Sequence, residues 1–455
     1  MKEAFLYNLY CYKYIFIIKT DFVYFSERFF MTAQTLAQKL IARASHRPEV
    51  AVDEIVTCAV DLAMFHDSSG PRRLKPMLEK LGAKIWDKSK VVLVMDHYVP
   101  EEDDDSRRIL KIARDWAFDQ QLPNVYDSIG ICHVVLPQKG HLRPGMFCVG
   151  GDSHSPTGGA FGAYMFGIGS TEMLGVVVTG EIWVRTPSTV AMDWSGRLSV
   201  GVTAKDMMLH MIGQFGTNGA NYGAVEFTGA AVSALSMQER MTLSNMSAEL
   251  GAQVGLIAPD QTTVDYLASV GVDEPIDLDY WRTDDNAQRE IRSFDADSLS
   301  PMVAAPHSPD NVHSVDEMHG TPVQVAYIGA CTGAKLDDLR AAACVLKGQR
   351  VDSGVRLMVA PATLRDQQDA QDEGIMDILI DAGAQVFATS CGACSGYGNA
   401  LKGATNVISS TARNFKGRMG SAETQVYLAS PYTVAASALA GRIADPRIML
   451  AEGRQ

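Results

Sequence analysis

The chain has 455 residues, of which 47% are hydrophobic and 20% charged, an ordinary globular composition with enough length for about three domains. Its 40 Lys and Arg against 53 Asp and Glu give a net charge of −13, which disfavours a general nucleic-acid-binding surface because such surfaces need clustered cations. Eight cysteines are far too few for a disulfide scaffold, so we expect reduced thiols and a cytoplasmic protein.

Residues 1–30 differ in composition from the rest of the chain. They contain 11 of the 31 Phe and Tyr residues, but Lys19 and Asp21 interrupt their apolar stretch, so they do not have the pattern of a signal peptide. We expect translation to start at Met31, and Thr32 to cap the first helix. No stretch of about 18 uncharged apolar residues is present, so no membrane-spanning helix is predicted.

Short runs rich in Val and Ile recur along the chain, with helical patterns between them. Continuous apolar runs of this kind predict parallel strands buried on both faces, and hence an α/β fold. The runs are residues 90–98, 147–154, 323–333, 355–363, 384–394, 405–411 and 425–431. Polar or glycine-rich residues follow each run, and ligands bind at the carboxyl ends of strands in open α/β sheets. We therefore expect a site built from these turns.

The segment 283–320 is polar, contains proline and is rich in turn formers. This composition predicts a connection between domains. We expect three α/β domains, over residues 31–187, 188–290 and 291–455.

Three cysteines are candidate metal ligands. Cys391 and Cys394 form a Cys-Gly-Ala-Cys motif after one predicted strand, and Cys331 follows another. A lone CxxC motif is compatible with a redox dithiol, half of a zinc site or ordinary loop cysteines. Three thiolates without an obvious fourth suit an iron–sulfur cluster with one open iron. The cysteines expected instead to act as small buried hydrophobes are Cys58, Cys132, Cys148 and Cys344.

Three histidines lie near predicted strand ends, beside or close to aspartates. They are His97 after Asp96, His154 after Asp152 and Ser153, and His133 after residues 129–132. A carboxylate partner fixes the protonation and orientation of an imidazole, so this pattern predicts acid–base groups.

Two further pairs of polar residues have a functional spacing. Asn245 and Glu249 are four residues apart, so they share one face of a predicted helix, and a solvent-exposed face is the alternative interpretation. Arg413 and Arg418 follow the run 405–411, where planar guanidinium groups can bind substrate carboxylates through two hydrogen bonds each.

Six motifs occur in an order typical of one protein family. The chain resembles the aconitase superfamily, and specifically the large subunit of isopropylmalate dehydratase-like hydro-lyases, from about Met31 to the C-terminus. The motifs are GDSHSPTGGAFGAYMFGIGSTE (151–172), SNMSAELGAQVGLIAPD (244–260), YIGACTGAKLDDLRAAA (327–343), SCGACSGYGNAL (390–401), TARNFKGRMGS (411–421) and YLASPYTVAASALAG (427–441).

The resemblance implies a three-domain α/β core with mostly parallel sheets, and one [4Fe–4S] cluster per subunit held by Cys331, Cys391 and Cys394. The open iron of such a cluster acts as a Lewis acid, so the implied reaction is dehydration and rehydration of a 2-hydroxy di- or tricarboxylic acid. The implied catalytic residues are Asp96, His97, His133, Asp152, His154 and Glu249. The implied substrate-binding residues are His66, Ser153, Asn245, Arg413 and Arg418.

The chain departs from the family pattern at two positions and in one segment. Gly333 and Ala412 stand where the family usually has Asn. These changes remove two amide groups near the cluster, so the resemblance does not decide which hydroxy acid is the substrate. The family's Gly-Ser-Ser-Arg segment, whose serine resembles the base and whose arginine binds carboxylate, is not found. In two-chain members this segment belongs to a swivelling fourth domain that is a separate small subunit. The resemblance therefore implies a small subunit as the partner, with no nucleic acid and no membrane.

Other interpretations stay open at this point. Homoaconitase-, citramalate- and dimethylmalate-type substrates compete with isopropylmalate, because one methylene changes binding by only about 1–3 kcal/mol. The alternatives from other classes are a cluster-free RNA-binding relative, which the acidic net charge disfavours, and a zinc or dithiol protein built on Cys391 and Cys394.

Overall fold

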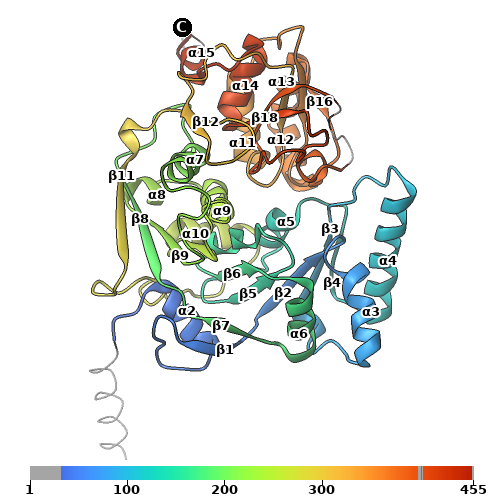
Figure 1. Cartoon of the computed structure of the whole chain (residues 1–455), viewed down its shortest axis with the longest axis vertical. Helices are drawn as coiled ribbons and strands as arrows, with labels where there is room; N and C mark the ends of the chain where they lie inside the picture. The colour runs from blue at the N-terminus through green and yellow to red at the C-terminus, as the bar shows by residue number, and fades with distance from the viewer. Residues whose placement is uncertain (1–31, 398–400, 402, 453–455) are drawn as a thin grey trace, which may run out of the picture.

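The structure, a computed structural model, describes residues 32–397, 401 and 403–452. The expectations about residues 1–30 and about Met31 as the translation start lie outside these residues. Three larger sheets and one two-stranded sheet organise the described part of the chain. In Figure 1 the third sheet and its helices form the upper part of the molecule, and the first two sheets lie below it.

The first sheet has five parallel strands in the order β4-β3-β2-β5-β6. They are β2 (Leu62–His66), β3 (Val91–Met95), β4 (Asn124–Asp127), β5 (Phe147–Gly150) and β6 (Tyr164–Gly167). The predicted runs 90–98 and 147–154 form β3 and β5, whose residues are all buried, as expected of parallel strands covered on both faces. The accompanying helices are α2 (Leu36–Ala44), α3 (Pro71–Leu81), α4 (Asp104–Gln120), α5 (Cys132–Gln138) and α6 (Ser170–Thr179).

Beside this sheet, β1 (Ile55–Ala59) and β7 (Glu181–Arg185) form an antiparallel pair. Helix α2 does not begin as expected, because its cap is Thr35, whose side chain accepts a hydrogen bond from Gln38 N. The Thr32 hydroxyl instead donates to Glu49 Oε2 over 2.9 Å.

The second sheet has four parallel strands in the order β10-β9-β8-β11. They are β8 (Thr189–Ser195), β9 (Ala224–Thr228), β10 (Val254–Leu256) and β11 (Glu290–Asp295), and the helices are α7 (Ala204–Phe215), α8 (Ala230–Ser233), α9 (Met237–Met246) and α10 (Gln261–Ser269). Strand β11 lies in the segment 283–320 that we expected to be a connection, and the expected boundary at residue 291 falls inside it. This edge strand pairs only with β8, and none of its residues is buried.

The third sheet has the order β13-β12-β18-β17-β14-β15-β16. Its strands are β12 (Met302–Ala304), β13 (Val312–Ser314), β14 (Val325–Ile328), β15 (Arg356–Val359), β16 (Gln385–Val386), β17 (Asn406–Ser409) and β18 (Gln425–Leu428). All the runs predicted between residues 323 and 431 contribute parallel strands, whereas β12 is antiparallel to both of its neighbours. The helices are α11 (Leu336–Leu346), α12 (Leu364–Asp372), α13 (Ile375–Ala382), α14 (Pro431–Ala440) and α15 (Pro446–Glu452).

The sheets share buried apolar side chains at their boundaries. One core cluster contains Met207 and Leu209 of α7 together with Val325 and Met358 of the third sheet, and a second places Cys331 with residues of the first sheet. The turn after β14 therefore lies where the parts of the molecule meet. No helix in the described ranges is long and apolar enough to cross a bilayer. The predicted α/β fold with mostly parallel sheets is confirmed.

Candidate active site

The three candidate cysteine ligands lie on two turns of the third sheet. Cys331 follows β14, and Cys391 and Cys394 belong to a short 3-10 turn (Gly392–Ser395) and its cap, after β16. Cys331 and Cys394 are buried, and Cys391 is half-buried. Asn245 of α9 donates its amide to Cys331 Sγ over 3.2 Å, and Cys391 N donates to the carbonyl of Asp96 over 2.9 Å. Contacts from both other sheets thus hold the cysteine turns.

The thiols differ in their tendency to lose a proton. The hydrogen bond from Cys391 lowers the pKa of Cys394 to about 5, against the effect of burial and with help from the positive charge of Arg418. The same bond raises the pKa of Cys391, and burial raises the pKa of Cys331 to about 12. Thiolates are the form that binds metal, so one ligand is ready and the other two release protons when a cation binds.

Asp96 and His97 lie directly after β3 and form an ion pair. His97 Nδ1 is 2.7 Å from Asp96 Oδ1, and Cys132 N donates to Asp96 Oδ2 over 2.7 Å. Burial alone lowers the pKa of His97, but the charge and hydrogen bond of Asp96 outweigh it and raise this pKa to about 10. The same interaction lowers the pKa of Asp96 although burial opposes it. His97 is therefore a protonated imidazole at neutral pH.

His66 and Asp67 lie at the end of β2, against this pair. The rings of His66 and His97 stack, with centroids 3.8 Å apart. Asp67 is fully buried, and its carboxylate accepts hydrogen bonds from the backbone N–H groups of His97 and Tyr98, at 3.1 and 2.8 Å. Asp67 was not among the predicted residues, although it follows a buried strand as Asp96 does, and that signal is enough to find it.

A second group of histidines and carboxylates surrounds Asp152. His133 Nε2 lies 2.7 Å from Asp152 Oδ1, and His154 Nε2 lies 3.0 Å from Glu249 Oε1. Burial raises the pKa of both carboxyl groups, but the charge of His133 on Asp152 and of His154 on Glu249 reverses that effect and lowers them. Each carboxylate is therefore ionised and can orient its imidazole partner.

Three expectations about these and neighbouring positions are wrong in detail. His133 lies on the first turn of α5 and not at a strand end. Helix α9 ends at Met246, so Asn245 and Glu249 do not share a helical face; both are nonetheless buried and reach the site, which removes the solvent-exposed interpretation. Cys344 is exposed on α11, although its apolar neighbours predicted burial.

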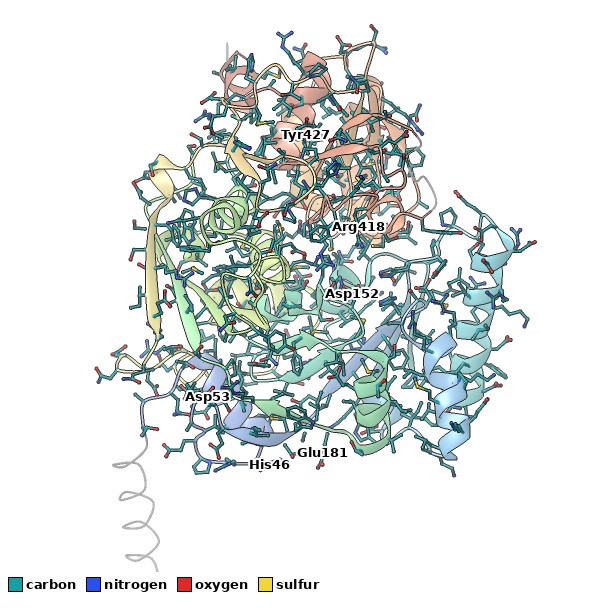
Figure 2. The ribbon with its side chains drawn as sticks, viewed as in Figure 1. His46, Asp53, Asp152, Glu181, Arg418 and Tyr427 are labelled. Carbon is teal, nitrogen blue, oxygen red and sulfur yellow. The ribbon has the colours of Figure 1, made fainter. Side chains whose placement is uncertain are left out.

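The two arginines reach the site from the loop after β17. Arg413 donates Nε to Glu249 Oε1 over 2.6 Å and Nη1 to Ser153 Oγ over 2.8 Å. Arg418 is half-buried, and its buried Nε has no hydrogen-bond partner in the described part of the chain. In Figure 2 Arg418 and Asp152 both lie in the zone where the upper and lower parts of the molecule meet. Arg413 is thus bound to Glu249 and Ser153, whereas Arg418 interacts with Cys394 and keeps its Nε free to donate.

Buried polar atoms without partners indicate where a ligand binds, because such atoms are normally hydrogen-bonded. Among the atoms of this kind in the described chain, Arg418 Nε, Asn245 Oδ1 and Glu249 Oε2 belong to the candidate site, whereas others, such as Trp194 Nε1, lie outside it. A cavity of about 390 Å³ opens nearby, with Asp152, Ser153 and Arg413 in its lining. These atoms fit a polar ligand bound next to Cys331.

The spacing of possible metal ligands differs between the histidine and aspartate side chains on one hand and the three cysteines on the other. Among the described residues, two sets have ligand atoms that all lie within 4.8 Å of one another: His66, Asp67, Asp96 and His97 in one, and His133, Asp152 and His154 in the other. The three cysteines do not form so tight a set. A single zinc ion needs sulfurs about 2.3 Å from the metal, so the wider spacing suits a cluster in which each cysteine binds its own iron.

Gly333 has a packing reason to be glycine. A Cβ atom built there would lie 2.2 Å from the Cβ of Ser410. The Ser410 hydroxyl accepts from Gly329 N over 2.9 Å and so joins the turn that carries Cys331 to the end of β17. The residue at 333 thus permits a close approach of two segments of the site. Ala412 is buried in the core, and nothing further in the structure explains it.

Two buried lysines next to the cysteine turns were not predicted. Lys205 and Lys335 are each 1% exposed. Lys335 Nζ donates to the carbonyl of Cys331 over 3.1 Å, and Lys205 Nζ donates to the carbonyl of Ser410 over 2.5 Å. Lys205 lies on the first turn of α7 and Lys335 is the N-cap residue of α11, and neither position carries a sequence signal of burial.

Comparisons with known proteins agree with these observations. A family model described as "Aconitase family (aconitate hydratase)" matches residues 38–322 and 314–441. The chain is 41% identical, over 420 residues, to the probable 3-isopropylmalate dehydratase large subunit of Methanothermobacter thermautotrophicus, with 91% of this chain and 99% of that protein covered. It is also 41% identical, over 418 residues, to the 3-isopropylmalate dehydratase large subunit of Nitratidesulfovibrio vulgaris, with 91% of this chain and 99% of that protein covered.

Among solved structures, the chain is similar to the holo form of aconitase X from Thermococcus kodakaraensis. The TM-score is 0.47 and the sequences are 11% identical, with 82% of this chain and 88% of that chain covered.

Proposed function

Because the chain belongs to the aconitase family of hydro-lyases, we propose that it is the large subunit of a two-chain enzyme that dehydrates and rehydrates a 2-hydroxy dicarboxylic acid of the isopropylmalate type. One observation carries this proposal. A protonated imidazole, three cysteines and a guanidinium with free donor capacity converge where the parts of the molecule meet. Expulsion of hydroxide from carbon needs an electrophile on the oxygen and an acid beside it.

We propose that Cys331, Cys391 and Cys394 hold a [4Fe–4S] cluster. When bound, the cluster supplies a Lewis acid that polarises the carbon–oxygen bond of the substrate. The sulfurs of the three cysteines do not all lie within 4.8 Å of one another, and this, with the unpartnered oxygens of Asn245 and Glu249, supports the assignment. Free thiols at all described cysteines also suit a reducing cytoplasm.

His97 is proposed as the acid for the departing hydroxyl. Its raised pKa keeps the imidazole protonated at neutral pH, and the Asp96 carboxylate on Nδ1 leaves Nε2–H free to donate. Asp67 holds the backbone of His97, so the imidazole has a fixed position. The His133–Asp152 and His154–Glu249 pairs are proposed to hold the protons around the hydroxyl oxygen.

Arg418 is proposed to bind a substrate carboxylate, because its buried Nε is free, while Arg413 is held by Glu249 and Ser153. The adjoining cavity is partly apolar, with Pro156 and Ile168 in its lining. An apolar substituent on the substrate fits this lining, which supports an isopropylmalate-type acid over a more polar one.

A second, smaller chain is proposed to supply the serine base that removes the carbon-bound proton and a further arginine. The "large subunit" names of the relatives support such a partner. In the described site, His133 is hydrogen-bonded to Asp152 and His154 to Glu249, so a base from outside this set completes the chemistry.

A substrate panel tests the proposal. The iron-loaded chain is combined with an isopropylmalate dehydratase small subunit and assayed with isopropylmalate, citramalate, dimethylmalate and homocitrate. We expect the highest kcat/KM with isopropylmalate. Turnover of none of these acids, together with bound zinc in place of iron, would overturn both the reaction and the cluster.

A further inference from the structure

Lys205 is a buried cation without a carboxylate partner. Lys205 is 1% exposed. Its Nζ donates hydrogen bonds to the carbonyl oxygens of Ser410 and Thr411, at 2.5 and 2.7 Å, and to the Thr332 hydroxyl at 3.3 Å. The adjacent carboxylate of Asp206 accepts from Thr203 N and Met302 N instead. In the described part of the chain, neutral oxygens are therefore its only hydrogen-bond acceptors.

Lys335 provides an internal contrast. It is equally buried and also lies beside the Cys331 turn, but its Nζ is 2.7 Å from Asp338 Oδ2. A buried ion pair of this kind is neutral as a unit, whereas an unpaired buried ammonium is strongly destabilising. Lys205 has no carboxylate within hydrogen-bond distance in the described chain, and the nearby charge of Asp338, which is already paired with Lys335, acts on it only from farther away.

The acceptors of Lys205 lie on the two segments that build the site. Thr332 follows Cys331 directly, and Ser410 and Thr411 precede Arg413 in the loop after β17. Thr332 Oγ1 also donates to the Ser410 carbonyl over 3.0 Å. One ammonium group therefore joins the turn of a cysteine ligand to the loop of the carboxylate-binding arginines.

Negative charge on the cysteines matches what Lys205 lacks. Burial lowers the pKa of Lys205 to about 8, against the opposing charge of Asp338 and, to a lesser extent, of Cys331 and Cys394. Three thiolates outweigh the positive charge of a [4Fe–4S] core, so the bound cluster is an anion. A cation held close to an iron–sulfur cluster stabilises its reduced form and raises its reduction potential.

We propose that Lys205 is a positioning residue of the active site, whose buried ammonium joins the Cys331 turn to the Arg413 loop and balances the charge of the cluster. This inference rests on the proposed function, because it requires a cluster on the three cysteines. Lys205 itself does not contact the substrate in this arrangement.

Thermal unfolding and redox titration of variants test the proposal. Lys205→Met removes the charge, and Lys205→Gln removes the charge but keeps a donor. Lys39→Met is the matched control, because Lys39 lies on α2, is 9% exposed and donates to two carbonyls, but is paired with Asp284 at 2.6 Å. Tm is measured for the metal-free and iron-loaded chain, and the potential of the bound cluster is followed by electron paramagnetic resonance.

For both Lys205 variants we expect the Tm gained on iron loading to be smaller than in the wild type, and the reduction potential to shift to more negative values. Lys39→Met should lower Tm equally in both forms and leave the potential unchanged. Equal losses of Tm in the metal-free and loaded Lys205 variants with a wild-type potential would overturn the proposal, as would failure of both variants to fold without iron. A wild-type chain that binds no cluster would instead refute the proposed function.

Discussion

At the scale of single residues, the pairing of His97 with Asp96 makes the most specific prediction. His97→Asn removes the proposed acid but leaves the cysteines in place. We expect kcat of the reconstituted two-chain enzyme to fall about 10²–10⁴-fold, with iron content and KM close to wild type. Near-normal kcat in a folded, iron-loaded variant would show that the pair only terminates β3.

The pH dependence of stability gives this variant an independent readout. The pKa of His97 is raised to about 10 in the folded chain, whereas the pKa of a histidine in an unfolded chain is roughly 6.5. Between these two pKa values His97 is protonated in the folded chain but not in the unfolded chain. The protonated His97 therefore contributes fully to stability below about pH 6.5, and this contribution is lost as pH rises toward about 10. The stability difference between wild type and His97→Asn should shrink over that window, and parallel curves would contradict the ion pair.

The cysteine assignment is tested by two serine substitutions. Cys391→Ser should lose most of the roughly four irons of the wild type, because serine does not replace a thiolate ligand well. Cys344→Ser is the matched control, since Cys344 is exposed on α11 and outside the site. Iron and sulfide analysis after anaerobic reconstitution measures both. Iron loss in the Cys344 variant with retention in the Cys391 variant would reverse the assignment.

Arg418→Lys separates binding from chemistry. Lysine keeps the charge but lacks the planar pair of donors, so we expect KM to rise roughly 10–100-fold while kcat changes much less. Arg365→Lys is the control, because Arg365 lies on α12 with its side chain 47% exposed. A large fall in kcat at unchanged KM would place Arg418 in the chemical step and not in substrate binding.

Residues near strand ends were the predictable part of the site, because parallel strands bring their carboxyl ends to one edge. His97, His154 and Cys331 are of this kind. Lys205 was not predictable, because its partners are carbonyls of distant segments. Spacing selected Glu249 for the wrong reason, because the structure places it beyond the end of α9 and not on a helical face shared with Asn245.

At the scale of elements, one bridge between segments supports the site. Gly130, before α5, pairs with Thr363, before α12, and Ile131 N donates to the carbonyl of Ala362 over 2.9 Å. The φ of Gly130 is +142°, and a Cβ there would lie 2.6 Å from Thr363 Cα. This contact fixes His133 on α5 relative to the third sheet.

Gly130→Ala should therefore destabilise the fold by about 1–3 kcal/mol through strain and overpacking. Gly348→Ala is the control for the close approach, because Gly348 also has a positive φ, +72°, but a Cβ there would meet no atom of the described chain within 4 Å. Urea unfolding of both variants measures the difference. If Gly130→Ala and Gly348→Ala had the same free energy of unfolding, the close approach of Gly130 to Thr363 would not contribute to stability.

Sequence patterns predicted β3, β5 and the parallel strands of the third sheet, but missed the fully buried β2 and all the strands of the second sheet. The run in β3 is apolar throughout, because both faces of that strand are covered. Strand β11 has charged residues at Glu290, Arg292 and Asp295 and no buried position, so its composition is that of a loop. Pairing with β8 alone made it a strand, and such pairing is not visible in local composition.

At the scale of the whole molecule, the order of the motifs predicted the fold class and the family, but not the contacts between the sheets. The hydrogen bond from Cys391 N to the carbonyl of Asp96 joins the third sheet to the first. It brings a cysteine ligand next to the proposed acid. Contacts between residues so far apart in the chain depend on how whole sheets pack, which one sequence does not reveal.

The central claim is that this chain provides the electrophile, the acid and the carboxylate-binding arginine, and that a second chain completes the site. Turnover of isopropylmalate by the iron-loaded chain, measured alone and after addition of an isopropylmalate dehydratase small subunit, tests it most directly. We predict negligible turnover by the chain alone and a large gain on addition of the small subunit. Robust turnover by the isolated 455-residue chain would contradict the account.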